Sequence, residues 1–213
     1  MKLLSISALL AISLIFFSCQ AQSGKKQVDK KMNITPPSGK AVAVFAEGCF
    51  WCSEHIFEAV VGVDSAVSGY AGGKTLNPTY DLVNTETTGH AESVLIYFDP
   101  KKVSYAELLN VFFTSHDPTT PERQGPDRGN SYRSIIFYSS PVEKELAEIS
   151  KAAYAKSFKN PIVSEIMQLT AFYKAEDYHQ NYIEHNPYSG YVMGVSIPRY
   201  ELFKKNYKGK LKK

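Results

Sequence analysis

The chain has 213 residues, of which 44% are hydrophobic and 13% aromatic, enough to bury the core of one globular domain. Its formal net charge of +3 is unevenly spread, because lysines gather in residues 20–40 and 204–213 and leave residues 41–203 net acidic. We therefore expect the lysine-rich flanks to be solvated tails and do not expect nucleic acid as a partner.

The first 18 residues have the pattern of a secretory signal peptide. Lys2 precedes an apolar run over residues 3–17, which is shorter than the roughly 20 residues that a membrane-spanning helix needs. The serine directly before Cys19 resembles the lipobox of bacterial lipoproteins, which implies lipidation of Cys19. An ordinary signal peptide with a coincidental cysteine stays open. We expect an exported, membrane-anchored lipoprotein that faces the periplasm or the cell exterior, with residues 19–40 as a flexible tether.

Hydrophobic patterning predicts an α+β domain over residues 41–203, followed by a basic tail. Apolar runs and alternation predict strands at 41–46, 63–70, 92–98, 134–139 and 163–169. Apolar stripes predict helices at 53–61, 104–115, 141–158 and 176–184. Residues 116–131 and those from 186 onward are punctuated by Pro and Gly and are expected to be irregular. The order βαββαβ is ferredoxin-like, so we expect a two-layer sandwich with a C-terminal helix, strand and loop extension.

With Cys19 assigned to an anchor, the folded part keeps two cysteines, Cys49 and Cys52, at the turn from the first strand to the first helix. Unpaired N–H groups and the dipole at a helix start lower a thiol pKa, which predicts a reactive thiolate at Cys49. Cys52 lies one helical turn away, at a Cβ separation of roughly 5–6 Å, so modest loosening of that turn would allow a disulfide.

On the residues alone, three functions for this pair are open. A structural disulfide across so short a loop would stabilise the fold little, and it would suit a lipoprotein without enzyme activity. A metal site would need two more soft ligands, whereas the five histidines are scattered, so no metal is expected. A redox-active pair is favoured, with general dithiol–disulfide exchange as one possible activity.

Gly48-Cys49-Phe50-Trp51 resembles the active-site signature of the A-type peptide methionine sulfoxide reductases. Further segments follow in the family's order and approximate spacing, over about residues 42–191. They are Gly69-Tyr70-Ala71-Gly72-Gly73, Asn77-Pro78-Thr79-Tyr80, Gly89-His90-Ala91-Glu92, Phe112-Phe113 through His116-Asp117-Pro118, Gln124-Gly125-Pro126-Asp127, Tyr132-Arg133-Ser134 and Tyr178-His179-Gln180-Asn181-Tyr182. The resemblance implies reduction of methionine S-sulfoxide, in oxidised proteins or as the free amino acid, and repair of oxidative damage.

The resemblance also implies a role for each site residue. Cys49 is the nucleophile that attacks the sulfoxide sulfur. Glu92 is the proton donor, since a buried carboxyl has a raised pKa. Tyr80 and Tyr132 donate hydrogen bonds to the sulfoxide oxygen.

Three further residues would bind substrate. Phe50 and Trp51 would hold the sulfur-bound methyl group, and Asp127 would accept a hydrogen bond from the substrate backbone. Tyr178 and His179 are expected to be structural.

The recycling step is where this chain departs from the commoner family pattern. Many members carry a resolving cysteine in the C-terminal tail and a glycine where Cys52 stands, but this chain has no cysteine after Cys52. The sulfenic acid on Cys49 must therefore be resolved by Cys52 or by an outside thiol, and proximity favours Cys52. We expect a thioredoxin or thioredoxin-like reductant, no cofactor, and a monomer.

Overall fold

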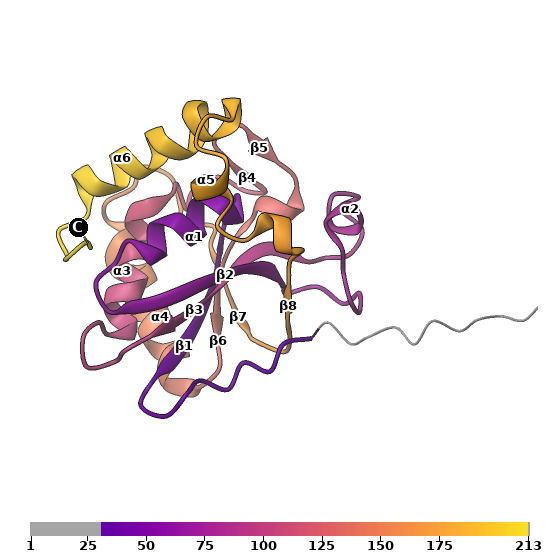
Figure 1. Cartoon of the computed structure of the whole chain (residues 1–213). Coiled ribbons are helices and arrows are strands. Elements are labelled where there is room, and N and C mark those ends of the chain that lie inside the picture. The colour runs from indigo at the N-terminus through magenta and orange to yellow at the C-terminus, as the bar shows by residue number, and fades with distance from the viewer. Residues whose placement is uncertain (1–30, 213) are drawn as a thin grey trace, which may run out of the picture.

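The computed structural model describes residues 31–212 (Figure 1). The expected signal peptide, Cys19 and the first part of the expected tether lie outside the described residues. Within the described part, no helix has both the length and the apolar character to cross a bilayer.

Eight strands and six α-helices make up the described chain. The strands are β1 (Ala41–Glu47), β2 (Val63–Ala71), β3 (Ala91–Phe98), β4 (Arg123–Gln124), β5 (Asp127–Arg128), β6 (Ser134–Tyr138), β7 (Glu165–Gln168) and β8 (Phe172–Lys174). The helices are α1 (Phe50–Glu58), α2 (Tyr80–Val83), α3 (Tyr105–Ser115), α4 (Pro141–Ala155), α5 (Tyr182–His185) and α6 (Ile197–Asn206). Two 3₁₀ turns, Asn130–Tyr132 and Asp177–His179, and a π-helical turn, Val192–Ser196, complete the set.

The main sheet has six strands in the order β7-β6-β1-β3-β2-β8. Its four inner strands pair antiparallel, and α1 and α3 make the two crossovers between them. This is the ferredoxin-like βαββαβ arrangement, so the predicted α+β class is confirmed. β7 adds to β6 in parallel and β8 adds to β2 antiparallel, which widens the sheet at both edges.

β1 is buried on both faces, as its continuous apolar run predicts. On the face covered by helices, Phe45 packs between Phe57 of α1 and Phe112 of α3, with each pair of ring centroids 5.4 Å apart. The next residue along, Ala46, faces a second core on the opposite side of the sheet, together with Leu95 and Phe137. The alternation fixes the register of β1, because a slip of one residue would exchange the two faces.

Residues 31–34 are part of the expected tether but lie against the folded domain. Met32 donates its backbone N–H to the carbonyl of Phe172 at 2.9 Å, so this segment extends the edge of the sheet beyond β8. The side chains of Met32 and Ile34 pack on the second core. This part of the chain is therefore ordered by backbone pairing and apolar contact and is not a free linker.

Two predicted segments have a different structure. The loop expected at 116–131 contains the β4–β5 hairpin, which turns at Gly125 with a φ of +58°, and a 3₁₀ turn. The helix expected at 176–184 is broken, because Asn181 takes a left-handed conformation with a φ of +51° between a 3₁₀ turn and α5. In both cases, single left-handed residues decide the path of the chain.

The irregular C-terminal tail expected from residue 186 is wrong. α6 covers Ile197–Asn206 and continues past the boundary expected at residue 203. Phe203 and Tyr207 are buried against the core, and Leu211 forms a β-bridge with Val60. Pro198 is the second residue of this helix and directly follows the π-helical turn, where the helical hydrogen-bond pattern changes and a missing N–H is tolerated.

Candidate active site

Cys49 occupies the N-cap position of α1, and its own side chain makes no capping hydrogen bond. The backbone N–H of Phe50, in the first turn of α1, instead donates a hydrogen bond to Oε2 of Glu92 on β3 at 3.0 Å. Gly48 has a φ of +92°, and a Cβ atom there would lie 2.4 Å from Cβ of Gln124. Only glycine fits between β1 and α1, and this tight turn places the sulfur of Cys49 beside the carboxyl of Glu92.

A pocket of about 370 Å³ opens over the start of α1. Every residue expected to act in catalysis or substrate binding lines it, with the exception of Cys52. The sequence did not predict three further lining residues, Tyr182, Ser189 and Tyr191. The full lining is Cys49, Phe50, Trp51, Tyr80, Glu92, Asp127, Tyr132, Tyr182, Ser189 and Tyr191.

Glu92 is 2% exposed, and burial raises the pKa of its carboxyl to about 8 despite the hydrogen bond from Phe50. At neutral pH the carboxyl therefore carries a proton that it can donate. Burial also raises the pKa of Tyr80 and of Tyr132, so both stay phenols and remain hydrogen-bond donors. Three proton-bearing groups thus face the same pocket as the sulfur of Cys49.

An aromatic wall closes one side of this pocket. The ring of Trp51 stacks on Tyr182 with centroids 3.7 Å apart and an interplanar angle of 8°, and Tyr191 meets it edge-on. Trp51 Nε1 donates to His179 Nδ1 at 3.1 Å, which fixes the orientation of the indole. This contact agrees with the structural role expected for His179. The wall offers the apolar, polarisable surface that a sulfur-bound methyl group prefers.

Asp127 reaches the pocket from β5, and the hydroxyl of Tyr191 donates to its Oδ2 at 2.6 Å. Burial raises the pKa of Asp127, and the hydrogen bond from Tyr191 opposes that shift. The carboxylate retains acceptor capacity toward the pocket, as a group that binds a substrate N–H requires.

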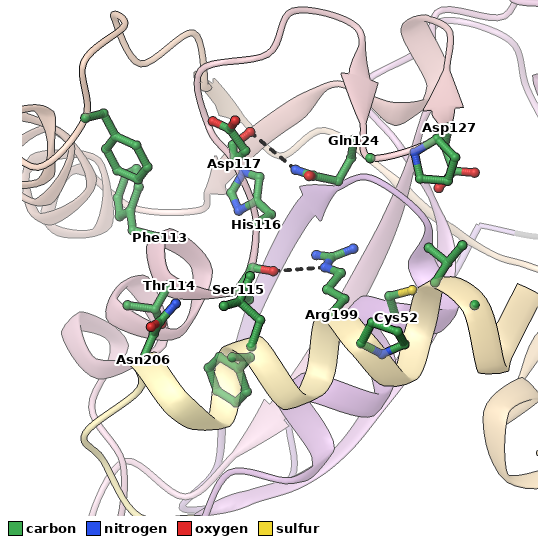
Figure 2. A pocket seen from close by; sticks show the side chains of 18 of the residues that line it. Cys52, Phe113, Thr114, Ser115, His116, Asp117, Gln124, Asp127, Arg199 and Asn206 are labelled. Carbon is green, nitrogen blue, oxygen red and sulfur yellow. Dashed lines mark hydrogen bonds between the residues drawn. The ribbon is translucent and has the colours of Figure 1, made fainter.

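Cys52 borders a second and larger pocket of about 780 Å³, between α3, α6 and the β4–β5 hairpin (Figure 2). Cys49 and Cys52 are both reduced and buried. The sulfur of Cys52 lies 3.2 Å from Oγ of Ser196 and hydrogen bonds to Cys49. The two sulfurs are thus neighbours that face different pockets.

The acidities of the two thiols differ from the expectation. Burial, together with the hydrogen bond to Cys52, raises the pKa of Cys49 well above its ordinary value. The hydrogen bond from Cys49, assisted by the charge of Arg199, lowers the pKa of Cys52 to about 6. The start of α1, expected to lower the pKa of Cys49, is thus opposed by burial and by the neighbouring thiol, and the directions of the two shifts favour the negative charge on Cys52.

Tyr191, Ser196 and Arg199 are functional-site neighbours that the sequence analysis missed. All three lie in the C-terminal segment that was expected to be irregular. The apolar spacing of Tyr200, Phe203 and Tyr207 is the helical signal that would have located α6 and, with it, the side chains near Cys52.

Over residues 31–212, no group of three or more His, Cys, Asp or Glu side chains is arranged to hold a metal ion.

Residues 41–211 match the family model described as peptide methionine sulfoxide reductase. Peptide methionine sulfoxide reductase MsrA 1 of Rhodopirellula baltica is 47% identical over 174 residues, which cover 82% of this chain and 91% of that protein. Mxr1 from Saccharomyces cerevisiae in reduced form has a TM-score of 0.69 at 32% identity, covering 72% of this chain and 89% of that one. Mxr1 in complex with Trx2 has a TM-score of 0.50 at 26% identity, with 68% and 86% covered. The chain therefore belongs to the A-type peptide methionine sulfoxide reductases and is an oxidoreductase that reduces methionine sulfoxide in the repair of oxidative damage.

Proposed function

We propose that this enzyme reduces methionine S-sulfoxide, in proteins or as the free amino acid, through nucleophilic attack by Cys49. The sulfenic acid that results is resolved by Cys52, and a thioredoxin-type protein reduces the disulfide. The observation that carries the proposal is the smaller pocket, in which one thiol, one protonated carboxyl and two phenols meet beside an aromatic wall.

The first step begins with the proton of Cys49. Its hydrogen bond to Cys52 lets the thiol pass this proton to the neighbouring thiolate as attack begins. A bond forms between the sulfur of Cys49 and the sulfoxide sulfur, while Glu92 gives its proton to the sulfoxide oxygen. The hydroxyl group then moves to Cys49 and the thioether leaves. Methionine is reduced, and Cys49 is oxidised to a sulfenic acid.

The second step closes the disulfide. The sulfur of Cys52 attacks the sulfur of Cys49, the S–S bond forms and the S–O bond breaks. The departing hydroxide takes up the proton that Cys52 gives up and leaves as water, so atoms and charge balance. Because the two sulfurs are already hydrogen bonded, this step needs only a local adjustment of the first turn of α1.

The third step is thiol–disulfide exchange with an outside reductant. Such an attack runs along the S–S axis, so the side from which a thiolate arrives decides which sulfur leaves. A thiolate arriving from the larger pocket meets Cys52 and expels Cys49 in its reduced form. A thioredoxin is the reductant we propose, and the complex of yeast Mxr1 with Trx2 supports that choice.

Replacing Cys52 by serine is expected to separate the two half-reactions. The variant should still form about one methionine per enzyme, because Cys49 and Glu92 are intact, but thioredoxin-driven turnover should fall to background. The measurement is product per enzyme with and without a thioredoxin system. Cys19→Ser is the matched cysteine control and should keep full turnover. Full thioredoxin-driven turnover by Cys52→Ser would show that another thiol resolves the sulfenic acid.

The function itself is tested by assaying separated sulfoxide epimers with the reduced enzyme. We expect reduction of the S epimer and no reduction of the R epimer, since each reductase type takes one epimer. Reduction of insulin disulfides in the absence of any sulfoxide activity would instead establish a general dithiol–disulfide oxidoreductase.

We also propose that the enzyme is an exported lipoprotein held at a membrane by Cys19. The support is the sequence of residues 1–19, with its charged start, short apolar run and serine before the cysteine. Cell fractionation should place the wild-type chain with membranes and the Cys19→Ala variant in the soluble fraction. Membrane association that survives this substitution would contradict the lipid anchor.

A further inference from the structure

Arg199 is the cation beside the cysteine pair. It comes from α6 and shares one wall of the larger pocket with Cys52, as Figure 2 shows. Two hydrogen bonds to backbone carbonyls fix its guanidinium: Nε donates to Ser115 at 2.9 Å and Nη2 donates to Glu47 at 3.0 Å. Nη2 also meets the carboxyl of Glu47 at 2.8 Å. The charge is therefore held in place before any substrate binds.

Glu47 offsets this charge only in part. It is fully buried, and burial raises the pKa of its carboxyl to about 7, so a large fraction is neutral at neutral pH. The guanidinium keeps its proton, because the nearby Glu47 and cysteines raise the pKa of Arg199 against the effect of burial. Arg199 is thus a partly balanced cation beside the sulfur of Cys52.

Ser196 gives the sulfur of Cys52 a second partner. Its hydroxyl lies 3.2 Å from that sulfur, where it accepts a hydrogen bond from a thiol and donates one to a thiolate. Ser196 is 1% exposed, so no bulk water competes for this contact. Hydrogen bonds from Ser196 and Cys49 and the charge of Arg199 therefore act together on one atom.

Within residues 31–212, the other titratable groups that act on the sulfur of Cys52 come from several elements, and none of them is a second cation. His116, at the end of α3, is neutral, because burial lowers its pKa to about 3. The groups that act on Cys52 are Cys49 of α1, Glu47 of β1, Glu92 of β3, Asp127 of β5, Tyr191 before the π-helical turn, and Arg199 of α6.

We infer that Arg199 is a positioning residue for the resolving step: with Ser196 it orients Cys52 and favours its thiolate form, so that Cys52 gives up the proton received from Cys49 and attacks the sulfenic acid. This inference rests on the proposed resolving function of Cys52. The attack forms the S–S bond, breaks the S–O bond of Cys49 and releases hydroxide, which takes up the proton that Cys52 gives up and leaves as water. A thiolate that forms again readily after the first step shortens the lifetime of the sulfenic acid, which is open to further oxidation.

The first test is a titration of Cys52 in the full chain. Cys49→Ser removes the neighbouring thiol while leaving a hydroxyl that can donate to Cys52, and the ultraviolet absorbance of the thiolate is followed against pH. The same titration of Cys49→Ser/Cys52→Ser supplies the blank for Cys19. We expect Arg199→Gln to move the Cys52 transition to higher pH, and Arg199→Lys to restore most of the shift.

Glu47→Gln is the matched partner variant, because it leaves Arg199 in place and removes the carboxyl that can offset its charge. It should leave the Cys52 transition at its wild-type pH or move it lower. A loss of local packing would instead move the Cys52 transition in the same direction in Glu47→Gln and in Arg199→Gln. This variant also tests the inference by itself if Arg199→Gln does not fold. A rise in the Cys52 transition in Glu47→Gln would overturn the inference.

The second test follows formation of the Cys49–Cys52 disulfide by peptide mass after one turnover. In wild type this rate should rise up to about one pH unit above the pKa of Cys52, which is about 6, and be nearly constant beyond that. In Arg199→Gln it should fall about tenfold at pH 5 for each pH unit that the transition has moved, and recover at high pH. A rate that is lower by the same factor at every pH would overturn the role of Arg199. Absence of the disulfide in wild type would overturn the resolving function of Cys52.

Discussion

Replacing Cys49 by serine is expected to lower sulfoxide reduction on the order of 10⁴-fold or more, the scale seen when a nucleophile is removed from an active site. A serine hydroxyl is a far weaker nucleophile toward sulfur than a thiolate. Cys52 cannot take over, because it lines the larger pocket and not the pocket formed by Glu92 and the two tyrosines. The rate of methionine formation under single-turnover conditions measures the effect.

The fold should survive this substitution. Serine is among the preferred N-cap residues, so Cys49→Ser leaves the start of α1 intact or better capped. An unchanged midpoint of urea unfolding would show that the loss of activity is chemical. If the variant kept a tenth or more of the wild-type rate, Cys49 would not be the nucleophile.

The second large effect is expected from Glu92→Gln, which should lower the rate of the sulfoxide step by about 10²–10⁴-fold. Glutamine can still accept the hydrogen bond from Phe50 N–H, so the start of α1 keeps its partner. The variant removes the proton that the sulfoxide oxygen needs. Single-turnover rates at pH 7 measure the loss.

The rate of the sulfoxide step should depend on pH through the protonation of Glu92. The pKa of Glu92 is about 8, so the acid is present below that pH and is lost as pH rises through it. The wild-type rate of the sulfoxide step should fall above about pH 8, and Glu92→Gln should lack this limb. Glu54→Gln is a matched control, since burial raises the pKa of Glu54 to about 7 and its carboxyl lies outside the Cys49 pocket. A limb near pH 8 that persists in Glu92→Gln would assign the acid to another group.

The sequence predicted the central layers of this fold because their signals are local. The apolar run of β1 and the stripe of Leu108, Leu109, Phe112 and Phe113 on α3 read directly as buried faces. The start of α1 could not be read in this way. The N–H of Phe50 in its first turn binds the carboxyl of Glu92, which is 42 positions away in the sequence. No residue near Phe50 in the sequence indicates that partner.

The residues of the site also divide into those that a local motif indicates and those that depend on contacts between distant parts of the chain. Cys49, Glu92, Tyr80 and Tyr132 were predicted from motif resemblance, and the structure brings them to one pocket. Arg199 was not predicted, because its contact with Glu47 joins residues 152 positions apart and depends on a helix stabilised by tertiary packing. The acidity of the thiols was missed for a related reason: the dipole at a helix start can be read from sequence, but the burial that outweighs it cannot.

In the proposed cycle, Cys49 removes the sulfoxide oxygen and Cys52 resolves the sulfenic acid that results. The most direct test is to mix the reduced full chain with one equivalent of methionine S-sulfoxide, without any reductant, and to map its thiols by peptide mass. We expect one methionine per enzyme, a disulfide between Cys49 and Cys52, and no change at Cys19. A product with both thiols still free, or with a disulfide that includes Cys19, would contradict it.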